Sequence, residues 1–177
     1  MPSSSEPTQA QAVYAIHNRL FFRLFQVGNT LDRQASNVMG ISTVQWAVLG
    51  ALTRPQAEQG MTFSELAEYL IVSRQSLDGV LKRLERDAHV ERVTDPHDRR
   101  ARRVVLTAHG RHFWRQLQPR IQAFYAAVMQ DIRFDDKVAM VHLLNVVNQG
   151  LATVHEVELP AAPTVATKKK AGRRPAR

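Results

Sequence analysis

The chain has 177 residues and no cysteine, and its 24 Lys and Arg against 16 Asp and Glu give a formal net charge of +8. This length allows a full hydrophobic core, and the lack of thiols excludes disulfides, thiolate metal sites and cysteine nucleophiles. Six of the cations and no acid lie in residues 162–177, so the remainder of the chain carries only +2.

Residues 1–9 are rich in Ser, Pro and Glu, and we expect them to be disordered. The sequence shows no signal peptide and no uninterrupted apolar run of about 18 residues, so we expect a cytoplasmic protein.

Over residues 11–37 apolar side chains recur at helical spacing, which predicts a long first helix. Gly40 interrupts this pattern. Ser42 is a suitable N-cap for a second helix that ends before Pro55 and should be buried, because it is apolar nearly all round.

Two short helices are predicted after a loop at residues 54–60. Thr62-Phe-Ser-Glu65 has the pattern of a capping box, in which the hydroxyl and the carboxylate each satisfy a backbone N–H at a helix start. This helix is expected to end near Leu70, and Ser73 is the natural N-cap of the next one. Two helices joined by three or four residues form a helix-turn-helix, whose second helix projects its N-terminal polar residues from the surface.

The outer face of this second helix suits the major groove of DNA, which admits a single helix. Arg74 can donate to guanine O6 and N7, Gln75 can pair with adenine, and Asp78 can accept from a cytosine amine. Lys82 and Arg86 lie farther along and are better placed for phosphates. An ordinary solvated face is the alternative, because charged outer faces are common on helices. The predicted contacts on this helix are Ser73, Arg74, Gln75, Ser76, Asp78, Gly79, Lys82 and Arg86.

Residues 90–94 and 102–106 favour β-strands, which predicts a two-stranded hairpin with a turn-rich tip. Residues 82–115 hold ten Lys and Arg against five acids, a local surplus that suits phosphate binding. A basic hairpin can straddle the DNA backbone and enter the minor groove. Asp98 can hold the guanidinium of Arg100 in place, or form only a surface salt bridge. The predicted contacts of the hairpin are Asp98, Arg99, Arg100 and Arg102.

Two further helices complete the predicted elements. Thr107 is suited to cap a helix that extends to about Asp131, and Pro119 is expected to bend or break this helix. The last helix is predicted from about residue 135 to residue 156. Residues 160–177 lack periodicity, and we expect them to form a disordered basic tail.

Five segments, in order along the chain, resemble the signature of MarR-type regulators, and the resemblance covers roughly residues 10–155. They are Thr62-Phe-Ser-Glu-Leu-Ala-Glu-Tyr-Leu70, Ser73-Arg-Gln-Ser-Leu77, Leu81-Lys-Arg-Leu-Glu85, Asp95-Pro-His-Asp-Arg-Arg100 and Val105-Leu-Thr-Ala-His-Gly110. The resemblance implies a mainly α fold with a small β-wing. It places a winged helix-turn-helix domain at residues 41–106 and dimerisation helices at residues 10–37 and 107–157.

The same resemblance implies a function. It indicates a homodimer that binds pseudo-palindromic operator DNA, usually as a repressor released by a small anionic or aromatic effector, and that needs no cofactor. It also implies that Asp98 orders Arg100 for entry into the minor groove. The chain departs from the family where Ala88-His89 replaces the usual glycine after the recognition helix. Alanine in the left-handed conformation costs about 1 kcal/mol more than glycine, so we expect a strained or displaced helix end.

The winged helix-turn-helix domain at residues 41–106 is called the reading head below. Outside it, the first helix and the last two helices carry apolar stripes. These stripes either close a small core within one chain or, as the resemblance favours, form a dimer interface that sets two recognition helices about 34 Å apart, one turn of DNA. The predicted interface residues are Val13, Ile16, Leu20, Val141, Leu144, Val147 and Leu151. The resemblance also implies an effector pocket, and the rings and cations that the sequence offers there suit an aromatic acid or its CoA thioester. Its candidate residues are His17, Arg19, Phe22, Arg23, Trp46 and Phe113, of which Trp46 and Phe22 are more simply explained as core.

Two alternatives remain open. His109 and His112 are spaced as metal ligands can be on a helix, which would suit a metal-responsive regulator, but no third ligand has a recognisable spacing and no metal site is assigned. The basic residues 168–177 can neutralise phosphates without reading bases, as a sequence-independent architectural protein does. Catalysis is not expected, because the sequence has no phosphate-cradling Gly-rich loop and no nucleophile in a known elbow.

Overall fold

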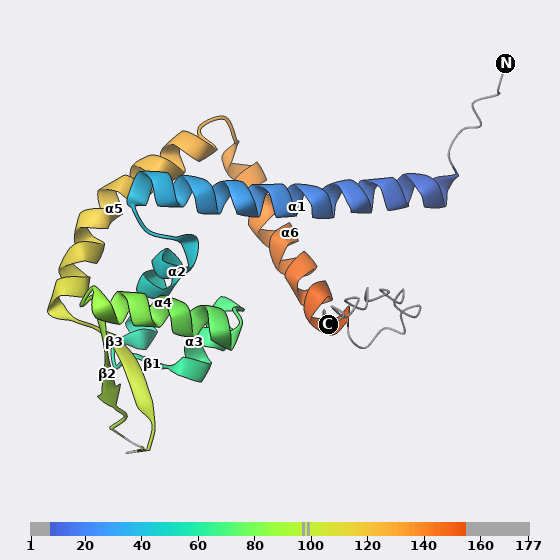
Figure 1. Ribbon diagram of the computed structural model, residues 1–177. Coiled ribbons are helices and arrows are strands. Elements are labelled where there is room, and N and C mark those ends of the chain that lie inside the picture. The colour runs from blue at the N-terminus through green and yellow to red at the C-terminus, as the bar shows by residue number, and fades with distance from the viewer. Residues whose placement is uncertain (1–7, 97, 99, 155–177) are drawn as a thin grey trace, which may run out of the picture. The chain divides into compact units, whose positions relative to one another are not determined.

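The computed structural model describes residues 8–96, 98 and 100–154. This part of the chain is mainly helical, with one small antiparallel sheet (Figure 1). The elements are α1 (Gln9–Met39), α2 (Thr43–Leu52), the 3-10 turn η1 (Pro55–Ala57), β1 (Met61–Thr62), α3 (Phe63–Leu70), α4 (Arg74–Arg86), β2 (Val90–Thr94), β3 (Arg102–Leu106), α5 (Ala108–Met129) and α6 (Phe134–Thr153). The predicted basic tail and most of the predicted disordered N-terminus lie outside the described residues.

The helices of the reading head begin where the sequence predicts them, because hydroxyl side chains cap them. Thr62 Oγ1 accepts from the N–H of Glu65 at 3.2 Å, and the Glu65 carboxylate accepts from the N–H of Thr62 at 2.7 Å. This pair is the predicted capping box of α3. Ser42 forms a second capping box at the start of α2, and Ser73 and Thr107 cap α4 and α5.

The long helix α1 begins at Gln9, two residues before its predicted start, because Thr8 caps it. Its C-terminal end is set by Gly40, whose φ of 73° lies in the left-handed region that glycine adopts at little cost. Near that end, Asp32 accepts from the hydroxyl of Thr43 at 2.6 Å and from its N–H at 3.2 Å. These two bonds tie α1 to the first turn of α2 and lower the pKa of Asp32.

The wing is a three-stranded antiparallel sheet in the order β1-β3-β2. The two long strands lie where they were predicted, with Val90 opposite Leu106 and Thr94 opposite Arg102. The predicted number of strands is wrong, because β1 pairs with the other edge of β3, and η1 occupies part of the predicted loop. A two-residue strand carries no periodicity that a sequence pattern can detect.

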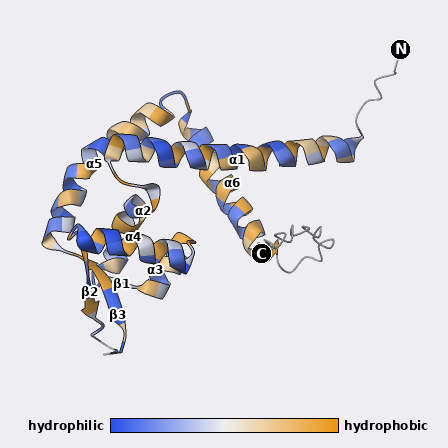
Figure 2. Cartoon of the chain, viewed as in Figure 1, coloured by the Kyte–Doolittle hydropathy of each residue, from blue (hydrophilic) through white to orange (hydrophobic). Residues whose placement is uncertain are grey.

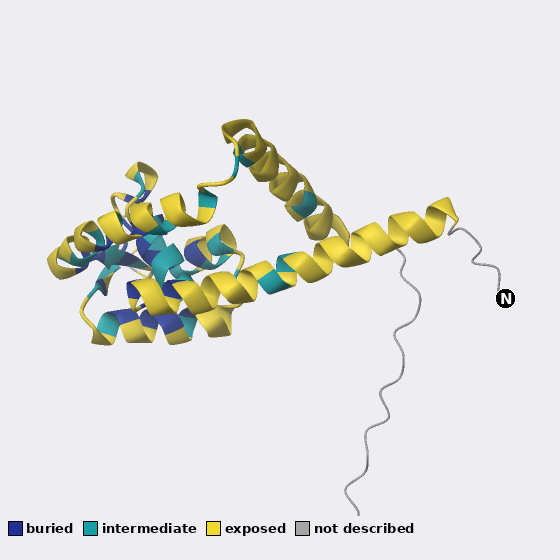
Figure 3. Cartoon of the chain, turned by 90° about the horizontal axis from the view of Figure 1, so that it is seen from above, coloured by how far each residue is buried: buried dark blue, intermediate teal, exposed yellow. Residues whose placement is uncertain are grey.

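The core lies where α2, α3 and α4 meet the sheet and the first half of α5. Figure 3 shows this buried group in dark blue. Each leucine buried there contributes about 2 kcal/mol, so the apolar face of α4 is fixed firmly against the core. The largest fully buried side chains are Val48, Leu49, Leu66, Leu77, Leu81 and Leu84.

The helix α5 runs through Pro119 without a break, and its ribbon bends along its length (Figure 1). A proline lacks the N–H that would bond to the preceding turn, which favours such a bend. The helix α6 belongs to a separate unit of structure and has no buried residue. It begins at Phe134 and ends at Thr153, and its predicted end at Glu156 falls outside the described residues.

The end of α4 shows the strain expected from Ala88. This residue is left-handed, with φ of 57°. The N–H of His89 donates to the carbonyl of Leu84 at 2.8 Å, and the N–H of Ala88 donates to the carbonyl of Glu85 at 3.0 Å. These are the two bonds of a Schellman motif, which glycine usually closes. The helix therefore keeps the usual end, and Ala88 stores about 1 kcal/mol of strain.

Candidate nucleic-acid interface

The helix α4 presents a polar face to solvent, opposite the face that enters the core. Because Leu77, Leu81 and Leu84 are fully buried, the opposite positions at helical spacing point outward. Arg74 and Ser76 flank that face and are exposed, whereas Asp78 is half-buried. The exposed outward residues are Gln75, Gly79, Lys82 and Arg86.

Gly79 lies in the middle of this outward face. A Cβ atom added there would meet no atom within 4 Å, so packing in the free protein does not require glycine. Glycine inside a helix destabilises it by about 0.5–1 kcal/mol relative to alanine. A glycine at this point therefore suits the close approach of another molecule to the backbone of α4.

Gly79→Ala should act in opposite directions on stability and on DNA binding. We expect the free energy of unfolding to rise by about 0.5–1 kcal/mol. Operator affinity should fall about tenfold, equivalent to about 1.4 kcal/mol, because the methyl group meets the DNA. Urea denaturation and fluorescence anisotropy with labelled operator measure the two effects. Gly28→Ala, at another open helical position, should gain stability and keep its affinity. An unchanged affinity of Gly79→Ala would contradict close contact at this residue.

Ion pairs hold several charged groups of α4 and β2. Lys82 Nζ lies 2.7 Å from Asp78 Oδ2, one turn earlier. Arg92 Nε lies 2.6 Å from Glu85 Oε1, and its Nη2 lies 4.0 Å from Asp78 Oδ1. Exposed pairs of this kind contribute about 0–1 kcal/mol, so phosphates can replace the acids at small cost. Asp78, predicted to accept from a cytosine amine, is engaged by two cations in the protein without DNA.

Arg74, the first residue of α4, is folded back onto α3. Its Cζ atom lies 5.0 Å from the centre of the Phe63 ring, and its Nη1 donates to the hydroxyl of Ser64 at 3.4 Å. The two helices of the helix-turn-helix are therefore joined at their N-terminal ends by the predicted base-reading arginine.

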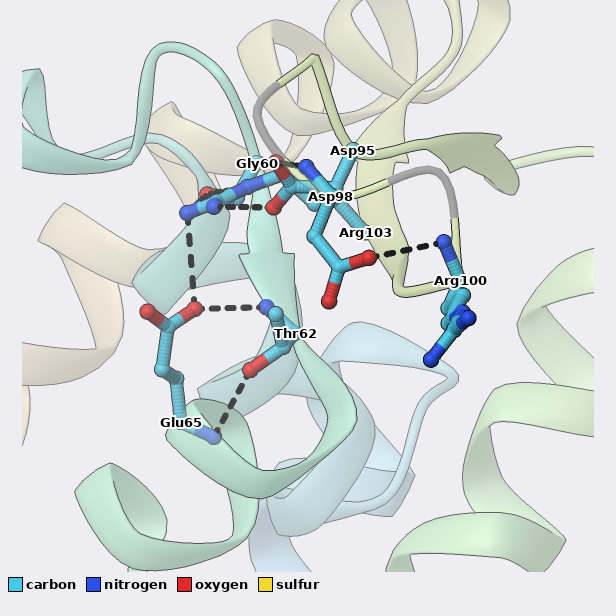
Figure 4. Close-up of polar contacts among 7 residues, drawn as sticks. All are labelled: Gly60, Thr62, Glu65, Asp95, Asp98, Arg100 and Arg103. Carbon is cyan, nitrogen blue, oxygen red and sulfur yellow. Dashed lines mark hydrogen bonds and ion pairs between the residues drawn. The ribbon is translucent and has the colours of Figure 1, made fainter.

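Asp98 orders the tip of the wing, although through a different atom from the one predicted. Its carboxylate accepts from the backbone N–H of Arg100 at 2.9 Å, where a bond from the guanidinium was expected (Figure 4). The bond shapes the turn, and the Arg100 residue stays exposed. Arg102 is exposed at the start of β3. Arg99, another predicted contact, lies outside the described residues.

Arg103 connects the base of the wing to neighbouring segments through hydrogen bonds. No sequence pattern predicted this role. Its guanidinium donates to Asp95 Oδ2 at 2.7 Å, to the Gly60 carbonyl at 3.1 Å and to Glu65 at 3.4 Å (Figure 4). The Arg103 and Asp95 side chains are only 19% and 7% exposed. Because Glu65 also belongs to the capping box of α3, this arginine fixes the base of the wing to the helix-turn-helix.

The position of Arg103 follows from strand register. Asp95 comes directly after β2, and Arg103 is the second residue of β3, so the register of Thr94 opposite Arg102 makes them diagonal neighbours. The sequence shows both residues but does not fix the turn length, and hence the register, that brings them together.

A stack of three rings fills the junction between α4, β2 and α5. The ring of His89 stacks with that of His109 and with that of Phe113, with centroid distances of 5.0 Å and 4.2 Å. The Nδ1 atom of His89 is buried without a hydrogen-bond partner. Burial lowers the pKa of His89, the neighbouring His109 lowers it further, and Asp87 opposes both effects.

The free energy of unfolding should therefore fall as the pH drops below about 6.5, the ordinary histidine pKa. His89 binds a proton less readily in the folded chain than in the unfolded chain, so acid favours unfolding until the lowered pKa is passed. His89→Phe should reduce the loss of stability between pH 7 and pH 5, measured by urea denaturation. His112→Gln, which removes an exposed histidine of α5, should keep the wild-type loss. Equal losses in wild type and His89→Phe would contradict this role.

The candidate effector residues are not gathered at one site. Phe113 stacks on His89 and packs against the core. Trp46 also packs against the core, and the centroid of its ring lies 5.8 Å from that of Tyr125. Burial raises the pKa of Tyr125. On α1, Phe22 is 59% exposed, and His17 and Arg19 are exposed as well.

Arg23 lines a hollow in the described part of the chain. This hollow is a groove of about 730 Å³ between α1 and α5, with a mostly apolar wall. The Arg23 guanidinium donates to the side-chain oxygen of Gln26 at 3.0 Å. The apolar side chains of the groove are Val27, Leu31, Phe124, Val128 and Met129.

The residues predicted to form a dimer interface are largely exposed in the single chain. Ile16 of α1 is 64% exposed and Val141 of α6 is 61% exposed. Figure 2 shows orange, hydrophobic residues along both helices. Val13, Leu20, Leu144 and Leu151 are exposed too, and Val147 is half-buried.

The described residues contain no helix that is long and apolar enough to cross a membrane. In the same part of the chain, no three His, Asp or Glu residues are grouped to hold a metal ion. His109, considered above as a metal ligand, contributes to the ring stack at the junction.

Comparison with known proteins decides the family. The MarR family profile matches residues 39–101. The chain is 47% identical over 139 residues to the transcriptional activatory protein BadR of Rhodopseudomonas palustris, a match that covers 76% of this chain and 79% of that protein. The chain belongs to the MarR family. The family resemblance noted in the sequence is thereby confirmed, and so is the mainly helical fold with its β-wing.

Two further relatives of this MarR-family chain are informative. It is 29% identical over 100 residues to the homoprotocatechuate degradative operon repressor of Escherichia coli, covering 56% of this chain and 66% of that protein. Its structure matches a MarR mutant from E. coli complexed with operator DNA, with a TM-score of 0.61, 26% identity and coverage of 71% and 91%. The chain is a DNA-binding transcriptional regulator and not an enzyme.

Proposed function

We propose that this regulator binds a pseudo-palindromic operator as a homodimer, with α4 in the major groove and the wing in the adjacent minor groove. The observation that carries this proposal is the outward face of α4. Polar and basic side chains surround the open Gly79 there, while three leucines hold the opposite face in the core. A face of this kind can lie against base edges without disturbing the packing beneath it.

The proposed contacts with DNA fall into two chemical classes, those with base edges and those with phosphates. Arg74 and Gln75, on the first turn of α4, read base edges, because their side chains can make paired hydrogen bonds to guanine and adenine. Lys82 and Arg86 bind phosphates, which fix the register but carry little sequence information. Arg100, at the tip of the wing, enters the minor groove. Ser73, Ser76, Asp78, Asp98, Arg99 and Arg102 complete the proposed surface.

Arg100→Ala tests the placement of the wing. We expect operator binding to weaken by about 1–3 kcal/mol, while the dimer stays intact because Arg100 is exposed and is not one of the proposed interface residues. The probe is a DNA fragment selected from random sequence by the wild-type protein, and anisotropy and sedimentation measure binding and assembly. Arg120→Ala removes the same charge from an exposed position on α5 and should have little effect. An unchanged affinity of Arg100→Ala would refute the wing assignment.

The exposed apolar residues of α1 and α6 support the dimer. Single exposed apolar residues are ordinary, but long apolar stripes on two helices mark an interaction surface. Figure 3 shows both helices mostly in yellow, as exposed, and Figure 2 shows them carrying orange residues. A second copy of the chain covers such stripes by twofold symmetry and doubles the number of recognition helices on one DNA site.

The α1–α5 groove is the proposed effector site. Its apolar wall suits an aromatic ring, and Arg23 supplies a cation for a carboxylate or the phosphates of a CoA thioester. The operon repressor similar to this chain is named for homoprotocatechuate, an aromatic acid, which supports this ligand class. His17, Arg19 and Phe22 of α1 are proposed to contribute at the rim, and Trp46 and Phe113 only through packing.

We propose activation as the direction of control, in place of the repression that the family resemblance implies. The relative that is 47% identical is named as an activatory protein, which favours activation by this chain. Aromatic acids and their CoA thioesters, added to the protein–operator complex, should change operator occupancy. Arg23→Gln should raise the ligand concentration needed and leave ligand-free binding unchanged. No response to any of these ligands would contradict the proposed effector class.

A further inference from the structure

The guanidinium of Arg74 is held differently from the charged groups of Lys82 and Arg92. Lys82 and Arg92 are each paired with a carboxylate. Among the described residues, no carboxylate lies within 4.0 Å of the Arg74 guanidinium, which lies over the Phe63 ring at 5.0 Å and within 3.4 Å of the Ser64 hydroxyl. The partner of this arginine is thus mainly an aromatic face.

The Phe63 ring is itself fixed in place. Phe63 is the first residue of α3 and follows directly on the capping hydroxyl of Thr62. Its side chain is partly buried and packs against the hydrophobic core. The ring is therefore a firm platform, and it belongs to a different helix from the arginine that it supports.

An aromatic face and a carboxylate affect an arginine differently. A carboxylate accepts two N–H groups of a guanidinium in a bidentate pair and so competes with a base for the same donors. A ring attracts the cation through its π face and leaves the N–H groups in the guanidinium plane available. Stacking also restricts a long side chain before binding, which reduces the entropy lost when the complex forms.

We propose that Phe63 is a positioning residue for base recognition, because its ring holds the Arg74 guanidinium ready for a guanine in the major groove. This inference rests on the proposed function, in which α4 reads the operator. Phe63 acts through Arg74 and does not itself touch DNA.

The test compares Phe63→Leu, Phe63→Tyr, Arg74→Ala and the double variant Phe63→Leu/Arg74→Ala in the full chain. Affinity is measured for the selected operator fragment and for a series with each base pair of the half-site replaced. Phe63→Leu should weaken binding about two- to fivefold, the size of an exposed cation–π contact. Phe63→Tyr keeps the ring face and should bind as wild type. The double variant should bind no more weakly than Arg74→Ala alone.

Three results would overturn the inference. The first is a double variant whose loss is the product of the single losses, because the two residues would then act independently. The second is tighter binding by Phe63→Leu, which would mean that the ring holds the arginine away from DNA. The third is unchanged base preference in Arg74→Ala, which overturns the proposed role of Arg74 as well. Melting temperatures accompany each measurement, and Phe63→Met replaces Phe63→Leu if the latter is poorly folded.

Discussion

Leu144→Glu in α6 should convert the protein to a monomer and lower its operator affinity by more than about 100-fold, because binding through two linked heads exceeds binding through one by about that factor or more. Leu144 is 44% exposed in the single chain and lies on the apolar stripe of α6. In the proposed dimer it is covered by the partner, and a carboxylate buried there without a partner costs several kcal/mol. Sedimentation measures assembly, and anisotropy measures affinity.

The matched control is Gln149→Glu. It adds the same charge to an exposed position on the opposite side of α6, so it should leave both assembly and affinity unchanged. A Leu144→Glu protein that stays dimeric would place the interface elsewhere. A monomer that binds the operator as tightly as wild type would show that two heads are not required.

Gly110→Ala should destabilise the fold by about 3 kcal/mol, since a methyl group forced against backbone cannot be relieved by a rotamer change. A Cβ atom at this position would overlap the carbonyl of His89. The first turn of α5 lies against the end of α4 there. The N–H of Thr107 donates to the His89 carbonyl at 3.1 Å, and its hydroxyl donates to the Ala88 carbonyl at 2.6 Å. Urea denaturation measures the loss.

Gly150→Ala is the control for this substitution. Gly150 is also helical, and a Cβ atom there would meet nothing within 4 Å, so the variant should be slightly more stable than wild type. A Gly110→Ala protein with wild-type stability would mean that α5 can shift away from His89 without cost. Operator affinity, measured in the same variant, would then report whether the shift moves the wing.

Local chemistry explains why so much of the fold could be predicted. A hydroxyl cap such as Thr62 or Ser73 satisfies backbone donors within three residues of itself, so its effect is visible in a short stretch of sequence. The strain at Ala88 was predictable for the same reason, because the Schellman motif is closed within six residues. The strand β1 was missed because its two residues are ordered by pairing with β3. Met61 pairs with Val104, 43 residues along the chain, and Thr62 pairs with Arg103, 41 residues along the chain.

The sequence was enough to name candidate residues of the site. It was not enough to predict which atoms of these residues contact one another. The sequence shows that Asp98 and Arg100 share a turn, but not that the carboxylate bonds to the backbone N–H. It shows Arg103 as one cation among several, but not as the link between Asp95 and Glu65. These contacts depend on strand register and on the approach of α3 to the wing.

The amino-acid sequence by itself determined the helix starts, the helix-turn-helix, the basic wing and the family, because these features depend on periodicity and on contacts between residues a few positions apart. Only the tertiary structure decided which cations are held by carboxylates, which cations lie on rings, and where α1 and α5 form a groove. Apart from the local pair of Lys82 with Asp78, these relations join different helices and strands, and they are fixed by packing. The reading surface is thus encoded locally, while the positions of its side chains are set by the fold as a whole.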